Sequence, residues 1–456
     1  MVVRYETRYQ EMMAQAEVPP EALDGLLERL AEFVLPFAAS LPAPWRGRVE
    51  EYVTGLLSSL EHKPAEGIAY LFDRDRQPLQ RFLGQAEWDY RPLPEVLAGQ
   101  VGDRIGEVDG VIVFDPSAFA KKGTKSVGVG RQWCGRLGKV ENCQVGVYMG
   151  YVSCKEHAIV DFRLYLPEEW AKDRRRREEA GVPKDVKFQT RHALALEMLK
   201  GSGSRLPHGW VAGDDEMGRS SAFRRDLTGM NERYLLAVPS NTLIRDQEVA
   251  PPDYSGKGRH PKVPFMRVDV WCAALPEGAW ERVEVRDGEK GPLVVEAVKR
   301  RVRARSETGG EGPDELLFIT RVIQQDKTYK IDYDLSNAAA TVALPELARA
   351  AKAEHRIEEC FERAKGEAGL GDYQVRNWPG WHRHQTLSLV AAWFLAEETR
   401  RKKNRDPRAD VAATAATDRR PDRCDARHRQ AREALPPKHP PAPPKRAGSL
   451  LLSSFT

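Results

Sequence analysis

Apolar residues recur at helical spacing over the first part of the chain. Three- and four-residue intervals between them predict amphipathic helices, and Pro19-Pro20 and Pro42 mark breaks. We therefore predict a small helical DNA-binding domain over residues 1–95. Its scattered basic residues suit a face that meets DNA phosphate, although a solvated helical surface explains them equally well. The apolar positions are Leu26, Leu27, Leu30, Phe33, Val34, Val53, Leu56, Leu57 and Leu60.

The pattern changes near residue 105 to short runs rich in Val, Ile, Tyr and Phe, bounded by Gly, Pro and charged residues. Such runs predict strands, here over 110–117, 141–153 and 157–167, and alternating helices and strands follow as far as residue 244. Three strands followed by this alternation predict an α/β (α+β) mixed sheet with flanking helices. Residues 96–244 would form the first part of the core.

Residues 245–335 interrupt the alternation with a basic, Pro/Gly-rich loop and several β-like runs. They predict an antiparallel, β-rich insertion or a separate lobe. After Ser336, which can cap a helix, 344–370 and 381–403 have helical patterns, so residues 336–403 would complete the core. The tail over 404–456 is rich in Arg, Asp, Ala and Pro and is expected to be disordered or translated in a shifted frame.

Composition narrows the classes of function. The 456 residues include 71 Lys+Arg and 67 Asp+Glu, so the net charge alone decides nothing about nucleic acid. No run of about 18 apolar residues and no secretion signal is present, which predicts a soluble, cytoplasmic protein without a membrane partner. Six separated cysteines without a CxxC pair argue against a disulfide scaffold or a structural zinc site. The sequence has no Walker-type loop, so it gives no indication of a nucleotide-binding site.

Three acidic positions are candidates for chemistry. Asp115 ends the run GVIVF, Asp214 and Asp215 end the short strand WVAG, and Glu358 lies on a predicted helix. Alone, each has an ordinary explanation: a turn, a helix cap or a solvated helix face. Together they can converge on two divalent cations, which activate a water or hydroxyl for phosphodiester cleavage. Oxygen ligands of this kind suit Mg²⁺, with Mn²⁺ as a substitute.

Several long motifs carry a resemblance to a known family. The sequence resembles DDE transposases of bacterial insertion sequences, DDE superfamily endonucleases with a ribonuclease H-like core, over most of residues 30–403. The motifs are VFDPSAFAKKGTKSVGVGRQWCGRLGKVENCQVGVYMGYVS, LPEEWAKD, GVPKDVKFQTRHALALEML, WVAGDDEMGRS and RIEECFERAKGEAGLGDYQVRNWPGWHRHQTLSLVAAWFL. The resemblance implies a metal-dependent DNA nuclease and strand transferase.

Carried over to this sequence, the resemblance implies Asp115, Asp214 and Glu358 as the catalytic, metal-binding acids. Met217 replaces the aromatic residue usual after the second Asp, and Asp215 is an alternative to Asp214. Glu358 stands seven residues before Lys365, as in the family's third motif, but Glu354 occupies the place of a frequent Arg. The role of Arg356 is therefore open, and Glu359 is an alternative acid.

Basic and aromatic residues near these motifs are candidates for DNA contact. The loop after the first Asp and the loop in the insertion are each interrupted by Gly, and such basic loops can hold the DNA backbone. An aromatic residue beside the first loop can stack on a base, although a buried core position is the commoner role for Trp. The candidates are Lys121, Lys122, Lys125, Trp133, Lys257, Arg259, Lys262, Arg356 and Lys365.

These observations predict a DNA transposase that cleaves the ends of an insertion sequence and transfers the strands into target DNA. The resemblance implies double-stranded DNA as the partner and a homodimer in a synaptic complex. It also implies that the protein associates with the nucleoid in the bacterial cytoplasm. Two alternatives remain open: a ribonuclease H-like nuclease without strand transfer, and an inactive, transposase-derived DNA-binding protein.

Overall fold

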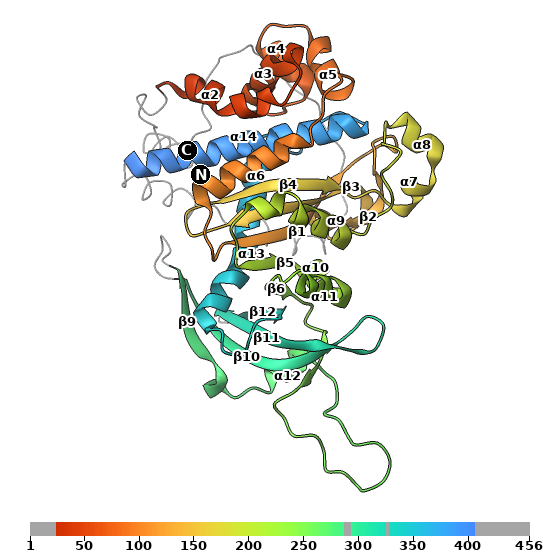
Figure 1. Ribbon diagram of the computed structural model, residues 1–456, viewed down its shortest axis with the longest axis vertical. Coiled ribbons are helices and arrows are strands. Elements are labelled where there is room, and N and C mark those ends of the chain that lie inside the picture. The colour runs from red at the N-terminus through yellow and green to blue at the C-terminus, as the bar shows by residue number, and fades with distance from the viewer. Residues whose placement is uncertain (1–23, 287–292, 325–327, 406–456) are drawn as a thin grey trace, which may run out of the picture.

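The computed structural model describes residues 24–286, 293–324 and 328–405. Its N-terminal part is helical, and these helices lie beside the long helix α14 (Trp378–Arg405) (Figure 1). Their buried apolar side chains belong to the same hydrophobic core as those of the sheet. The domain boundary predicted at residue 95 falls within the last of them. The helices are α2 (Leu26–Ala39), α3 (Arg46–Leu56), α4 (Ala65–Leu71), α5 (Arg76–Gly84) and α6 (Pro92–Ile105).

The core sheet has the order β4-β3-β1-β5-β6. Its first three strands pair antiparallel, and β1, β5 and β6 pair parallel. This confirms the predicted mixed sheet with flanking helices. A further strand, β2, shares the edge of β3 with β4. The strands are β1 (Val111–Ala120), β2 (Gly130–Cys134), β3 (Lys139–Val152), β4 (His157–Leu164), β5 (Trp210–Gly213) and β6 (Tyr234–Ala237).

Helices cover both faces of this sheet. Successive strand residues point to opposite faces, and consecutive residues of β1 are buried, so both faces carry apolar side chains. On one face lie α13 (Leu344–Gly366) and α14, where Tyr148 donates a hydrogen bond to Gln385 at 2.6 Å. On the other lie α9 (Arg191–Lys200) and α11 (Ser221–Gly229), where the rings of Phe114 and Phe223 are 6.5 Å apart. The short helices α7 (Glu168–Lys172), α8 (Arg174–Glu179) and α10 (Asp215–Arg219) complete the core.

The insertion continues the core sheet. Its strand β12 pairs antiparallel with β6, so a single twelve-stranded sheet runs through both parts of the described chain. The small helix α12 (Val268–Ala273) packs on a second cluster of buried apolar residues there. The predicted antiparallel unit is thus part of the sheet and no separate lobe. Its strands are β7 (Leu243–Asp246), β8 (Met266–Arg267), β9 (Glu281–Arg286), β10 (Leu293–Arg305), β11 (Glu311–Ile323) and β12 (Tyr329–Ser336).

Some local predictions differ from the structure. Ser336 caps no helix: it ends β12, where its hydroxyl donates to the carbonyl of Tyr234 at 2.5 Å, and α13 begins eight residues later at Leu344. The helix predicted to continue to residue 370 ends at Gly366. The edge strand β2 was not predicted from the sequence. The predicted tail, apart from residues 404–405 of α14, lies outside the described residues.

Two absences apply to the described ranges. None of the helices there combines the length and apolar character of a membrane span. The cysteines between residues 24 and 405 are all free thiols, and only Cys154 is exposed.

A buried ion pair fastens α11 to the insertion. Arg224 donates to Glu315 at 2.6 Å, and the Tyr234 hydroxyl donates to the same carboxylate oxygen at 2.6 Å.

We expect Arg224→Met to lower the free energy of unfolding by about 3–5 kcal/mol, because it leaves a buried carboxylate without its cation. Chemical denaturation measures this loss. Arg219→Met, which removes the exposed partner of Asp215, should cost at most about 1 kcal/mol; equal losses would contradict this account.

Candidate active site

The sheet register brings two acidic side chains together. Phe114 of β1 is paired with Gly213 of β5, so Asp115 and Asp214 follow at neighbouring positions on parallel strands. Side chains at neighbouring positions point to the same face of a sheet, and this is the face covered by α13. The structure therefore brings the first two predicted acids together.

Asp115 is partly buried on β1, opposite Tyr148 of β3. Burial raises the pKa of its carboxyl group to about 8, and the charge of Asp214 adds to this increase. The ammonium group of Lys365 acts in the opposite direction. The carboxylate of Asp115 is thus held where its negative charge is poorly solvated and needs a cation.

Asp214 follows β5 and is the N-cap of α10. Its side chain accepts a hydrogen bond from the backbone N–H of Met217 at 3.1 Å, as an N-cap does. Burial nevertheless raises the pKa of Asp214 to about 7, while that hydrogen bond lowers it. Asp215, the alternative acid, is exposed and pairs with Arg219 at 2.9 Å. Of the two, only Asp214 is drawn into the region beside Asp115.

The helix α10 can approach the sheet because residue 218 is glycine. A Cβ atom at Gly218 would lie 1.9 Å from the carbonyl oxygen of Ala237 on β6. The residue that replaces the family's usual aromatic, Met217, is fully buried and packs against Gly213. This packing fixes the turn that carries Asp214.

The predicted third acid, Glu358, lies on α13, and its charge adds to the increase in the pKa of Asp115. Its side chain is 69% exposed and pairs with the ring of His355 at 3.0 Å. That hydrogen bond lowers the pKa of Glu358. The alternative acid Glu359 pairs with Arg356 at 3.0 Å and lies 3.4 Å from His157 of β4. Of these two acids, Glu358 is the one whose charge acts on Asp115, although its side chain is exposed.

Another acid of α13, Glu354, faces the sheet. It lies in the stripe of helix positions whose other members are buried and apolar, and burial raises its pKa well above the usual value. The charges of Asp334, Asp214 and Asp115 add to that increase. Sequence reasoning missed this residue because motif spacing selected Glu358. The signal was the three- and four-residue spacing of Leu347, Ala350, Glu354, Ile357, Phe361 and Ala364.

Lys365 extends from the same helix to β1. Its ammonium group donates to the Ser117 hydroxyl at 2.9 Å and lies 4.7 Å from the ring centre of Phe361. Ser117 is two residues beyond Asp115, so both side chains point to the same face. The predicted basic residue of the third motif is therefore next to the first acid.

The candidate DNA contacts of the first loop divide into two groups. Lys121 lies 3.6 Å from the ring centre of Tyr373, and burial lowers its pKa to about 8. Lys122 and Lys125 are exposed in the loop between β1 and β2. Trp133, on the edge strand β2, is 56% exposed. Trp133 is therefore no core residue, and its ring is open to a partner.

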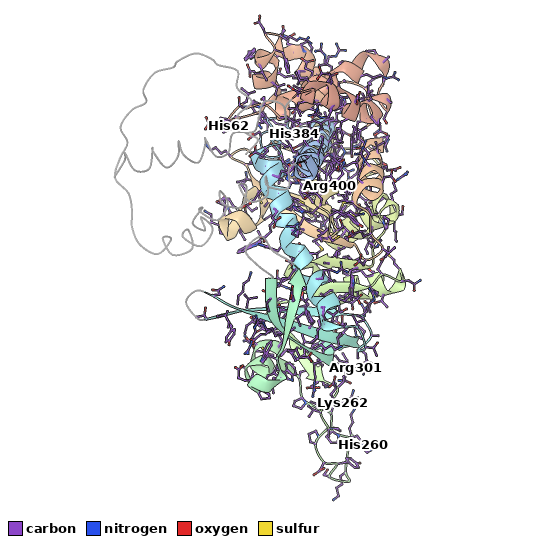
Figure 2. The ribbon with its side chains drawn as sticks, turned by 90° about the vertical axis from the view of Figure 1, so that its left-hand side faces the viewer. His62, His260, Lys262, Arg301, His384 and Arg400 are labelled. Atoms are coloured by element: carbon purple, nitrogen blue, oxygen red, sulfur yellow. The ribbon has the colours of Figure 1, made fainter. Side chains whose placement is uncertain are left out.

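The loop between β7 and β8 extends away from the rest of the molecule (Figure 2). Lys257 and Arg259 are exposed there, and the His260 ring stacks on Tyr254 with centroids 4.1 Å apart. Lys262, at the base of the loop, pairs with Glu311 at 2.6 Å. The tip of the loop thus offers two exposed cations, whereas the base is tied to β11.

The acids fit an oxygen-coordinated cation in their chemistry. Asp115 and Asp214 supply carboxylate oxygens, and burial disfavours the charge of both. The charge of Asp214 adds to this effect at Asp115, and the charges of Glu216 and Asp215 add to it at Asp214. A divalent cation relieves such repulsion. Within the described residues, however, no group of three or more His, Cys, Asp or Glu is close enough to hold a metal ion.

Comparison with known proteins agrees with this geometry. A sequence model of the DDE superfamily endonucleases matches residues 36–292. The chain belongs to this family. The match to the DDE superfamily endonucleases includes Asp115 and Asp214 and ends before α13. The family is the one that the sequence motifs predicted.

Two individual proteins are similar to this DDE superfamily endonuclease. A probable transposase for insertion sequence element IS701 of Microchaete diplosiphon is 28% identical over 193 residues, which is 42% of this chain and 48% of the relative. The match thus spans about half the length of that relative. A piggyBac transposase in a synaptic complex with hairpin DNA aligns over 86% of this chain and 76% of its own, with 10% identity and a TM-score of 0.36. A TM-score this low supports no further conclusion.

The raised pKa of Asp115 has a consequence for stability. The folded protein retains this proton up to about pH 8, whereas the unfolded chain releases it near pH 4, so the ionisation opposes folding increasingly as the pH rises between these values. In buffer without divalent metal, Asp115→Asn should therefore raise the free energy of unfolding by about 1–3 kcal/mol at pH 8 and by less at pH 5.

Denaturant titrations at the two pH values measure this difference. Asp215→Asn is the matched control, because Asp215 is exposed and its replacement should change stability little at either pH. A stabilisation by Asp115→Asn that is the same at pH 5 and pH 8 would contradict the account.

Proposed function

We propose that this DDE superfamily endonuclease is a DNA transposase that cleaves DNA at the ends of an insertion sequence and joins the freed ends to target DNA. The observation that carries the proposal is the adjacent pair of half-buried carboxylates, Asp115 and Asp214, beneath α13 and beside Lys365. The name of the similar probable transposase supports the same reaction. Double-stranded DNA is the proposed partner, and a homodimer that holds two ends together is part of the proposal.

The proposed cofactor is Mg²⁺, with Mn²⁺ as a substitute, because hard divalent cations prefer carboxylate oxygens. Asp115 and Asp214 would hold it, with Glu358 as the predicted third acid. A cation held by these acids would supply activation of the attacking oxygen and stabilisation of the leaving oxygen in phosphodiester cleavage. Glu358 is exposed and joined to His355, so it would have to turn away from that ring to take part.

The remaining residues position the DNA. Lys365 can offer its ammonium group to a phosphate beside the acids, while Ser117 and the ring of Phe361 hold its side chain in place. Lys122, Lys125 and Trp133 lie on the β1–β3 side of the core. We propose that the lysines contact the backbone and that Trp133 stacks on an unpaired base. The DNA-binding role predicted for residues 1–95 remains a prediction.

The exposed loop of the insertion is proposed as a second DNA contact. Within this loop, Lys257 and Arg259 are the residues that we propose to contact DNA, because both are exposed. Lys262, Lys121 and Arg356 were predicted as contacts too, but each has a close partner within the chain: Glu311, Tyr373 and Glu359. Their contribution to DNA binding should be smaller, because DNA would have to compete with these partners.

Strand cleavage tests the proposed reaction. A labelled duplex carrying the DNA ends that flank the gene is incubated with the full chain and Mg²⁺ or Mn²⁺. We expect wild type to cut at the element end, and Asp115→Asn, Asp214→Asn and Glu358→Gln each to bind DNA but lose cleavage by about a hundredfold or more, since each removes a charged ligand. Asp215→Asn, adjacent but exposed, is the matched control and should cut normally.

The same assay separates the alternatives. Cleavage followed by joining of the 3′ end to a target plasmid supports the transposase. Cleavage without joining indicates a nuclease of the same fold, and binding without cleavage under either metal indicates an inactive, transposase-derived protein. Both of these results would reject the proposed function.

The salt dependence of DNA binding tests the loop. Each phosphate contact that is lost lowers the slope of log affinity against log salt by about 1. We expect the double variant Lys257→Ala/Arg259→Ala to lower it by about 2, and Lys262→Ala to change it less because Lys262 pairs with Glu311. Fluorescence anisotropy at several salt concentrations measures the slopes. An unchanged slope in the double variant would remove the loop from the DNA interface.

A further inference from the structure

The short helix α8 consists of four consecutive arginines followed by two glutamates. Two of the arginines hold the local fold together. Arg177 donates to three backbone carbonyls in the segments before and after α8. Arg176 lies over the indole of Trp170, with its guanidinium carbon 3.8 Å from the ring centre. These two side chains therefore have structural partners within the protein.

Arg176 and Trp170 also fasten α8 to the loop between β1 and β2. Arg176 donates to the carbonyl of Thr124 at 2.8 Å, and the indole N–H of Trp170 donates to the carbonyl of Val129 at 2.7 Å. Both carbonyls belong to the loop that follows the strand of Asp115. The helix and the loop are thus held together beyond the end of that strand, and Figure 1 shows α7, α8 and β2 at this same end of the core.

The other two arginines of α8 point into solvent. The side chains of Arg174 and Arg175 are 89% and 90% exposed. Each pairs at 2.9 Å with an exposed glutamate one helical turn further on, Glu178 and Glu179. Exposed pairs of this kind hold their partners weakly, and a guanidinium binds a phosphate with two parallel hydrogen bonds. A phosphate can therefore compete with these carboxylates for both arginines.

The loop adds positive charge to the same surface. Residues 121–129 contain three lysines and no acid, and Lys122 and Lys125 are exposed. Residues 168–179 contain five basic and five acidic side chains, so the loop gives the surface as a whole its positive surplus. A surface with such a surplus attracts the phosphates of nucleic acid.

We propose that Arg174 and Arg175 bind the backbone of duplex DNA together with Lys122 and Lys125, at a distance from the point of cleavage. Two observations carry the inference: the exposure of one half of the arginine run, and the hydrogen bonds by which the other half fixes α8 to the lysine loop. It rests on the proposed function, because that function places the scissile phosphate beside the acids of the core.

The length of β1 indicates where along the DNA this contact lies. The strand continues for five residues from Asp115 to Ala120, which is about 17 Å at the spacing of a β-strand. Successive phosphates of one DNA strand are about 3.4 Å apart along the helix axis. Duplex DNA that runs along β1 from the acids therefore reaches α8 after about five base pairs.

The salt dependence of DNA binding to the full chain tests the proposal. Fluorescence anisotropy in EDTA measures binding without cleavage. We expect Arg174→Ala/Arg175→Ala to lower the slope of log affinity against log salt by about 2. The matched control is Arg104→Ala/Arg205→Ala. These two arginines are also exposed and paired with glutamates, but they precede β1 and β5 at the opposite end of the parallel strands, so the slope should not change.

Removal of the competing carboxylates gives a second measurement with the opposite sign. Glu178→Gln/Glu179→Gln frees both arginines and should raise the affinity for DNA about threefold at low salt. Glu95→Gln/Glu397→Gln makes the same change of net charge beside the control arginines and should raise it less. All these side chains lie at the surface, so each variant should keep the Tm of wild type.

Shortened duplexes test the position of the contact. The effect of Arg174→Ala/Arg175→Ala should disappear when the DNA on one side of the cleavage point is shorter than about five base pairs. An unchanged slope in this variant, or an equal gain in affinity from both pairs of glutamate substitutions, would overturn the proposal.

Failure of this inference is distinguishable from failure of the proposed function. If wild type cuts and joins DNA while Arg174→Ala/Arg175→Ala binds with the wild-type slope, the transposase stands and α8 is removed from the DNA interface. If that variant lowers the slope but the wild-type chain cuts no DNA, the DNA-binding surface stands and the transposase is rejected.

Discussion

Repulsion among buried carboxylates is the constraint on which the rest of this structure depends. Asp115, Asp214, Asp334 and Glu354 lie between one face of the sheet and α13, and burial raises the pKa of each. Such an arrangement opposes folding when the groups are ionised. It persists because the surrounding apolar packing is extensive.

The elements around these acids lie close together. Gly218 lets α10 touch β6, and the pairing of β12 with β6 lines up the strands from both halves of the sheet. Lysines from α13 partly offset the negative charge: Lys365 acts on Asp115, and Lys352 pairs with Asp332. The helix thus brings both an acid and its compensating cations to one face.

The sequence was sufficient for much of the core. Asp115 and Asp214 each follow a short apolar run, and these runs form neighbouring parallel strands, so local pattern found both acids. The pattern did not show that β1 continues past Asp115 to Ala120. Glu354 and Asp334 could not be found in this way, because their proximity depends on the pairing of β12 with β6 across about a hundred residues of chain. Partners such as Tyr373 for Lys121 and Glu311 for Lys262 are equally non-local.

The pairing of β12 with β6 also restricts how this protein can change during evolution. An insertion that is joined to a core only by two linkers can be deleted or replaced without changing the core. Here its last strand carries the buried Asp334 and leads directly into α13. Removing or replacing residues 243–336 would take away one wall of the acidic site, so the β-rich insertion and the core must be inherited together.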